Sequence, residues 1–224
     1  MKLTVRDVIE LFKVSEKTVY RWIYEDEFPA SQVHGQYRIN PTELMEWAAA
    51  RQIPIPAGLF RKKEKSAQSF PALSEALERG GIFHDVGGND KPTVLRAAVQ
   101  SMRLPEGVDR EDLLGVLLAR EGLGSTGIGD GIAVPHVRNP IIFPVPQSSL
   151  TLCFLQKPVD FGALDGKPVH SLFTLVSHTV RVHLHLLSQL AFALRQPAFG
   201  DLVQKHAPAA EIIQAAREAE GIPH

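Results

Sequence analysis

A glycine-rich segment near the middle of the chain constrains the fold more than any other part of the sequence. Residues 120–138 read REGLGSTGIGDGIAVPHVR, and five glycines occupy ten positions before Pro135-His136. Glycine loses more backbone freedom on ordering than any other residue, so this segment cannot form a stable helix interior. We expect a loop whose backbone N–H groups can approach a polar ligand such as a phosphoryl group.

Two common nucleotide-binding motifs are excluded in this segment. The string GLGSTG at residues 122–127 matches the dinucleotide fingerprint, but that fingerprint needs a strand before it and a helix after it. Here residues 110–120 are predicted to be helical, and the residues that follow are apolar and interrupted by proline. The segment contains no Gly-Lys-Ser/Thr, which excludes a Walker-type phosphate loop.

The composition is that of an ordinary soluble protein. The 224 residues are 44% hydrophobic and 22% charged, and a net charge of −1 predicts no bulk attraction to nucleic acid or membrane. A single cysteine, Cys153, excludes an internal disulfide and is predicted to be a small core residue. No apolar stretch approaches the ~20 residues of a membrane span, and the N-terminus has no hydrophobic signal region, so we expect a cytoplasmic protein.

The N-terminal residues have the pattern of a small helix-turn-helix domain. Residues 3–12 and 16–24 carry apolar side chains at helical spacing, with Thr4 and Ser15 as caps. Alternation around Gly35 over residues 32–39 predicts a small hairpin or wing, and Asn40-Pro41-Thr42 begins a third helix over residues 43–51. Residues 1–52 therefore resemble the excisionase/MerR-like winged helix-turn-helix domains.

This resemblance implies DNA contacts from the second helix and the wing. The candidates are Lys17, Thr18, Arg21, Gln36 and Arg38. Against DNA binding, residues 1–52 hold seven Lys/Arg and eight Asp/Glu, and phosphate neutralisation supplies most non-specific affinity. A module that contacts protein instead of DNA therefore remains an alternative.

A second, larger domain is expected after a linker. Residues 53–69 combine two early prolines with a basic run, which is typical of a tether. In residues 70–224, strands are predicted at 82–86, 148–155 and 169–176, and helices at 74–79, 91–102, 110–120, 181–194, 198–206 and 209–218. Helices and strands mix without a strict βαβ repeat, so we expect an α/β domain with a mixed sheet flanked by helices.

Three motifs in this domain resemble the fructose/mannitol-type enzyme IIA domains of the bacterial phosphotransferase system, nearest to the nitrogen-regulatory branch. They are REGLGSTGIGDGIAVPH at 120–136, FGALDGKPV at 161–169 and HLHLLS at 183–188. The resemblance covers roughly residues 70–220 and implies phosphorylation of His136 by a phosphohistidine carrier protein, with no cofactor. It places His183 and Arg120 beside that histidine. Regulated target proteins are further possible partners, and the oligomeric state stays open.

The residue types suit phosphoryl transfer. A neutral imidazole is a nucleophile at pH 7, and a phosphoryl group needs positioning and support for three charged oxygens. Arg120 can supply a two-pronged contact, and His183 a hydrogen bond. The other predicted phosphate-binding residues are Ser125, Thr126, Gly127, Gly129 and Arg138.

Other interpretations of the same residues remain. His136, His178, His183 and His185 lack the i, i+4 spacing and the accompanying carboxylate of a metal site, so we expect no metal. The family usually has glycine after the active histidine, whereas this chain has Val137. Either the loop is rebuilt with His136 still active, or the chain is a IIA-like interaction protein without phosphoryl transfer. A DNA-binding transcription regulator with a passive IIA body is a third alternative.

Overall fold

The computed structural model describes residues 3–25, 28–33, 36–51, 53, 70–136 and 145–221. Contacts divide the chain into two compact units, Met1–Ala67 and Gln68–His224, each of which is described here by itself. The predicted linker at 53–69 lies outside the described residues except for Ile53, so its boundaries stay a prediction. No described helix has the length and apolar character that a membrane crossing requires.

The first unit is a helix-turn-helix followed by a hairpin and a third helix, as the sequence pattern predicts. Its elements are α1 (Val5–Phe12), α2 (Glu16–Glu25), β1 (Ala30–Val33), β2 (Gln36–Ile39) and α3 (Pro41–Ala50). Thr4 caps α1 in a reciprocal capping box with Asp7, which satisfies two backbone donors that the helix itself leaves unpaired. The strands pair antiparallel and form the expected wing.

Aromatic packing holds the first unit together. Trp22 of α2, Trp47 of α3 and Phe28 are buried, and their ring centroids lie 4.9 to 6.0 Å apart. A unit this small buries little surface, so three large rings that each bury 150–250 Å² supply much of its hydrophobic stabilisation.

The second unit is an α/β domain that contains five strands and six helices among its described residues. The strands are β3 (Ile82–Val86), β4 (Gly127–Gly129), β5 (Ile132–Ala133), β6 (Ser149–Val159) and β7 (Val169–Val176). The helices are α4 (Leu73–Gly80), α5 (Lys91–Ser101), α6 (Arg110–Gly122), α7 (Val180–Leu194), α8 (Pro197–Gln204) and α9 (Ala209–Glu220). Every predicted helix and strand is confirmed within a few residues, apart from the extension of β6 to Val159.

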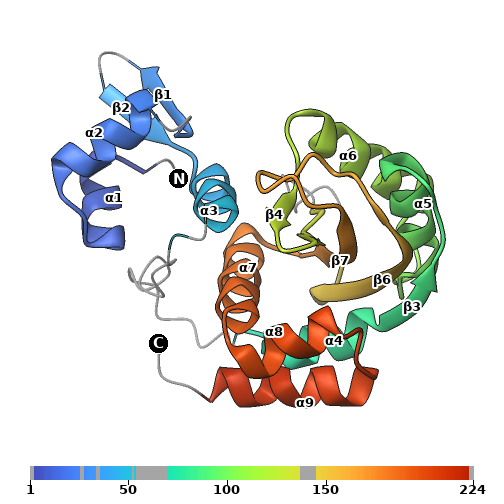
Figure 1. Ribbon diagram of the computed structural model, residues 1–224. Helices are drawn as coiled ribbons and strands as arrows, with labels where there is room; N and C mark the ends of the chain where they lie inside the picture. Colours follow the sequence, from blue (N-terminus) through green and yellow to red (C-terminus); the bar gives the residue numbers. More distant parts are fainter. Residues whose placement is uncertain are drawn as a thin grey trace. The chain divides into compact units, whose positions relative to one another are not determined.

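The sheet is mixed, which confirms the expected fold class. Its strand order is β3-β6-β7-β5-β4, with parallel pairs β3–β6 and β5–β7 and antiparallel pairs β6–β7 and β4–β5. Helices cover both faces (Figure 1). On one face α4, α7, α8 and α9 pack on the sheet, and on the other α5 and α6 do so. Because both faces are covered, β7 is buried at seven of its eight positions, including the polar Ser171 and Thr174.

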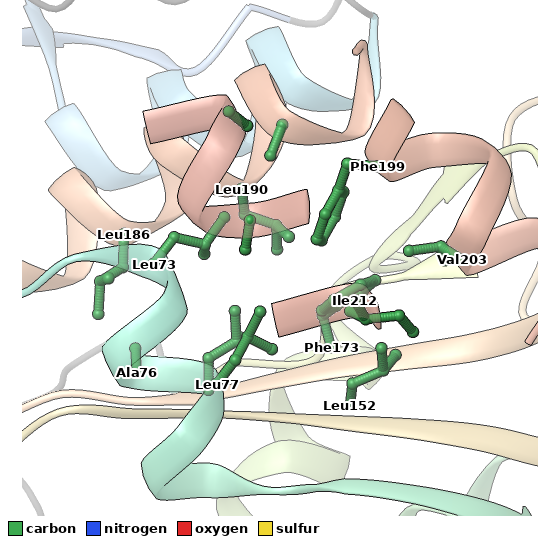
Figure 2. Close-up of a cluster of buried hydrophobic side chains, with 14 of the residues drawn as sticks. Leu73, Ala76, Leu77, Leu152, Phe173, Leu186, Leu190, Phe199, Val203 and Ile212 are labelled. Carbon is green, nitrogen blue, oxygen red and sulfur yellow. The ribbon is translucent and has the colours of Figure 1, made fainter. Parts of the chain in front are cut away.

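The core between the sheet and the four-helix layer is the larger of the two (Figure 2). Leu152 and Phe173 rise from the sheet to meet Leu77 of α4, Phe199 of α8 and Ile212 of α9. All five side chains are fully buried. Cys153 faces the opposite core, and burial raises the pKa of its thiol to about 12, so it is an inert packing residue, as predicted.

The glycine-rich segment forms a β-hairpin, so the expectation of an open loop there was wrong. Gly129 of β4 pairs with Ile132 of β5, and the two residues between them, Asp130 and Gly131, both have positive φ. A two-residue turn of this kind matches the twist of the strands, and it favours glycine. A Cβ at Gly131 would lie 2.3 Å from the imidazole of His170, so the close approach requires glycine.

We expect Gly131→Ala to destabilise the second unit by about 2–3 kcal/mol, because it combines left-handed strain with a steric clash. Gly166→Ala is the matched control: Gly166 also has positive φ, at 68°, but a Cβ there meets nothing within 4 Å. It should cost only the strain of about 1–2 kcal/mol.

Chemical denaturation, monitored by far-UV circular dichroism, measures the loss of unfolding free energy in each variant. Trp22 and Trp47 are the only tryptophans and lie in the first unit, so tryptophan fluorescence reports separately on that unit. If the two variants lost equal free energy of unfolding, a steric clash at Gly131 would be contradicted.

Candidate functional site

Parallel pairing places His136 at the end of the central strands. Ile132 lies opposite Ser171, and His136 forms a bridge with Leu175, so the same offset continues beyond the end of β5. Side chains alternate along an extended strand. Ile132 and Val134 belong to the core beneath α7, and the alternation therefore turns His136 toward the same face.

Helix α7 brings the second predicted histidine to the same place. The helix follows β7 directly, and Thr179 caps it by accepting the amide of Val182. His183 lies in its first turn on the face that also carries Leu186 and Leu190, and it is fully buried. The ring centroids of His136 and His183 are 5.1 Å apart. The structure thus brings together two side chains that are 47 residues apart in the sequence.

A backbone hydrogen bond fixes the tautomer of His136. Its Nδ1 lies 2.7 Å from the carbonyl oxygen of Val134. A carbonyl oxygen can only accept, so Nδ1 carries the proton. In the neutral ring the lone pair is then on Nε2, which is the nucleophilic nitrogen. The imidazole is only 3% exposed, because it continues the buried central strand.

Arg120 lies where α6 ends and the chain turns toward the hairpin. Its Nη1 donates to the carbonyl oxygen of Gly124 at 3.0 Å, and the side chain is half-buried. The guanidinium therefore stabilises the turn that leads into β4. A role in phosphate binding stays a prediction.

The remaining predicted phosphate ligands have structural partners. The Oγ of Ser125 accepts the amide of Gly127 at 3.0 Å, and the hydroxyl of Thr126 donates to Glu121 at 2.6 Å. A Cβ at Gly127 would lie 2.7 Å from that of Ala163, and one at Gly129 would contact Asp165. Close packing therefore requires glycine at position 127, whereas the φ of +97° favours glycine at position 129. The predicted contact of both glycines with phosphate remains untested.

Two charged residues that sequence analysis missed lie beneath the hairpin. The carboxylate of Glu121 is buried, accepts the amide and hydroxyl of Thr126, and lies 3.3 Å from Nζ of Lys91. The signal that could have found it is spacing: Glu121 follows Leu114 and Leu117 on the buried face of α6. A carboxylate at a core-facing position needs partners, because burying a charge without them is costly.

Asp165, in the loop between β6 and β7, acts as a clamp on the hairpin turn. The Asp165 carboxylate accepts the amide of Asp130 at 2.8 Å and that of Lys167 at 3.1 Å. These two hydrogen bonds lower the pKa of Asp165. Asp-Gly is a sequence typical of turns, and the structure adds to Asp165-Gly166 a tertiary contact with the hairpin turn.

Other histidines of the region have separate neighbours. His185, two residues after His183, stacks on Phe70 at 4.8 Å, so the two histidines face different sides as predicted. His178 hydrogen-bonds the Oγ of Ser148 through Nδ1 at 3.0 Å. In the part of the chain that the structure describes, no group of three or more His, Cys, Asp or Glu residues could hold a metal ion. Arg138 and Val137 lie outside the described residues.

The predicted DNA-contacting residues lie on α2 and the wing. Lys17 and Arg21 are exposed on α2. The hydroxyl of Thr18 hydrogen-bonds that of Ser15 at 2.8 Å, which gives it a role at the start of the helix. Arg38 is half-buried and donates to the exposed Gln36 at 3.0 Å across one face of β2.

We expect Asp165→Asn to lower the melting temperature more at pH 6 than at pH 3, because it weakens the clamp on the hairpin only where the carboxylate is ionised. The folded-state pKa lies below the ordinary value of 3.8, so the carboxylate contributes stability above that value. This contribution disappears as the pH falls through the folded-state pKa. Asp160→Asn is the control, since Asp160 accepts an amide within its own loop, from Gly162. If Asp165→Asn lowered the melting temperature equally at both pH values, the stabilising role of the ionised carboxylate would be contradicted.

Comparisons with known proteins identify both units. Residues 75–218 match the phosphoenolpyruvate-dependent sugar phosphotransferase system EIIA 2 family, and residues 3–52 match a helix-turn-helix domain. The nitrogen regulatory protein of Pseudomonas aeruginosa is 39% identical over 146 residues, which cover 63% of this chain and 91% of that protein. Its counterpart in Escherichia coli K12 is 32% identical over 132 residues, covering 56% and 75%.

A solved structure agrees with these matches. The nitrogen regulatory protein IIA-Ntr of Neisseria meningitidis is 31% identical, with a TM-score of 0.53 over 64% of this chain and 94% of that one. The resemblance drawn from the sequence motifs is thereby confirmed. The chain belongs to the EIIA 2 family of the phosphotransferase system, with nitrogen regulatory proteins among its relatives and a helix-turn-helix domain on its N-terminal side.

Proposed function

We propose that this chain is a regulatory component of a phosphotransferase system that accepts a phosphoryl group on Nε2 of His136. The observation that carries the proposal is the arrangement of His136: its Nδ1 proton is held by Val134, and its ring lies against His183. Family membership supports the same role. The donor would be a phosphohistidine carrier protein of the system.

The proposed step is a simple displacement. The lone pair of Nε2 attacks the phosphorus atom, and a new N–P bond forms as the N–P bond to the carrier histidine breaks. The electron pair of the broken bond returns to the carrier ring. The Nδ1 proton stays hydrogen-bonded to the carbonyl oxygen of Val134, so the attacking ring needs no prior proton loss.

Two residues that the resemblance places at the site can support the three charged oxygens of the transferred group. His183 can donate a ring N–H, and it lies in the first turn of α7, where the helix dipole favours negative charge. Arg120 supplies a positive charge at the turn before the hairpin. Phosphoryl transfer depends mainly on positioning and electrostatic support of this kind.

Burial of His136 favours one alternative. At 3% exposure the ring must become accessible before a carrier histidine can reach Nε2. The same burial would suit a IIA-like interaction protein that takes up no phosphoryl group. An assay for uptake of radiolabelled phosphoryl groups decides between phosphoryl transfer and the interaction protein.

We expect the full chain to take up label from phosphoenolpyruvate, enzyme I and the carrier protein, and His136→Ala to abolish uptake. His183→Ala should slow the transfer by about 10²-fold, because it removes a hydrogen-bond donor to the charged oxygens of the transferred group. The readout is the rate of radiolabel transfer under single-turnover conditions.

His185→Ala is the matched control for His183→Ala, because it removes a histidine two positions along the same helix that stacks on Phe70 instead. This control should leave the rate close to that of the unmodified chain. Absence of label on the unmodified chain would contradict the proposed function and favour the interaction protein.

We also propose that the first unit binds DNA, with Lys17 and Arg21 toward the phosphate backbone. The supporting observation is that both side chains are exposed on one helix of a helix-turn-helix domain, beside a wing that carries Arg38. In such domains the second helix enters the major groove. The phosphorylation state of the second unit would then alter contacts of the whole chain with its targets.

We expect Arg21→Ala to weaken binding to genomic DNA fragments and to reduce the slope of log K against log salt by about one, because one phosphate contact is lost. Arg6→Ala removes an equal charge from the exposed surface of α1, where Arg6 pairs with Glu10 at 3.5 Å. This control should leave the slope unchanged. If the full chain fails to shift DNA at low salt, DNA binding by this unit is contradicted.

A further inference from the structure

A continuous set of hydrogen bonds connects the buried carboxylate of Glu121 to the ring of His136. The hydroxyl and the amide of Thr126 donate to Glu121 Oε2 at 2.6 and 3.1 Å. The carbonyl oxygen of Thr126 accepts the amide of Val134 at 3.0 Å. The carbonyl oxygen of Val134 accepts the Nδ1 proton of His136 at 2.7 Å.

Each member of this path is buried. The exposed fractions are 8% for Glu121, 5% for Thr126, 6% for Val134 and 3% for His136. Hydrogen bonds in such surroundings are stronger than in water, and a charged acceptor at one end strengthens its own bonds further. The position of the Val134 carbonyl oxygen therefore depends on where Glu121 holds Thr126.

Glu121 is itself held from a third element. Nζ of Lys91, at the start of α5, lies 3.3 Å from Glu121 Oε1 and 5.7 Å from the ring centroid of Phe161. The carboxylate thus joins α5, the end of α6 and the first strand of the hairpin. Its other oxygen, Oε2, accepts the hydrogen bonds from Thr126, and Thr126 in turn connects Glu121 to His136.

We propose that Glu121 is a positioning residue that fixes the tautomer and orientation of His136 through Thr126 and Val134. This inference rests on the proposed function, since it assigns to Glu121 the task of presenting Nε2 for attack. Without the carboxylate, Thr126 loses two hydrogen bonds, the hairpin shifts, and the Val134 carbonyl oxygen no longer selects the Nδ1–H tautomer. A displaced nucleophile reacts more slowly even when its own chemistry is unchanged.

The experiment measures the tautomer and the transfer rate in the full chain. Long-range ¹H–¹⁵N spectra give the ring ¹⁵N shifts of His136, assigned with His136→Ala. We expect the Nδ1–H tautomer in the unmodified chain and a mixture of tautomers in Glu121→Ala, with transfer from the carrier slowed by at least about tenfold. Glu121→Gln keeps an acceptor oxygen for Thr126 and should restore the tautomer and most of the rate.

A matched control comes from another carboxylate of the same unit. Glu220 also accepts a backbone amide and a hydroxyl, both from Ser74, at 2.6 and 3.2 Å. These residues belong to α4 and α9, which carry no residue of the candidate site. Glu220→Ala should lower the melting temperature of the second unit without changing the tautomer of His136 or the transfer rate.

The outcomes separate the inference from the proposed function. If Glu121→Ala behaves like Glu220→Ala, with lower stability but unchanged tautomer and rate, Glu121 is only structural. Slower transfer with an unchanged tautomer would also overturn the inference. Should Glu121→Ala not fold, Glu121→Asp, which withdraws the carboxylate from Thr126, must still change the tautomer. If the unmodified chain takes up no phosphoryl group, the proposed function fails, while the tautomer still tests the positioning role.

Discussion

The parallel pairing of β5 with β7 is the constraint on which the candidate site depends. The register does not change between Ile132 and His136, so the alternation of side chains along the strand decides which face the imidazole meets. Because β7 runs directly into α7, the start of that helix lies at the same end of the sheet, and His183 reaches His136. A shift of one residue in this register would turn His136 to the opposite face of the sheet, away from His183.

The hairpin that carries this strand explains why the segment is rich in glycine. Gly127 and Gly131 lie against Ala163 and His170, and any side chain would collide with these neighbours. Local propensity indicated a loop, because glycine disfavours strands. Within the hairpin β4 pairs with β5, but β5 itself pairs with β7, some 40 residues later, and that contact cannot be read from local sequence. The same density of glycine can therefore indicate tight packing as well as an anion-binding loop.

Apolar periodicity was sufficient for the fold, and the family resemblance for the two histidines, but neither predicted their supporting contacts. Apolar spacing located the helices, and the motifs pointed to His136 and His183, which the structure places in contact. The tertiary contacts of Glu121 and Asp165 were missed because their partners, Thr126 and Asp130, are defined by the three-dimensional path of the hairpin. The degree of burial of His136 was also missed, since it follows from the sheet and the helix that cover it.

Burial of the nucleophile gives the proposed reaction a regulatory consequence. A phosphoryl group on Nε2 would add a charge of about −1.5 to −2 and three acceptor oxygens to a ring that is now 3% exposed. A charge of this size cannot stay in an apolar interior without donors, because the cost of desolvation is too large. Either Arg120 moves inward to join His183 in pairing with it, or the segment that bears His136 opens toward water. In both cases the proposed phosphorylation would give the chain a different surface, and a partner that contacts this end of the sheet would distinguish the two states.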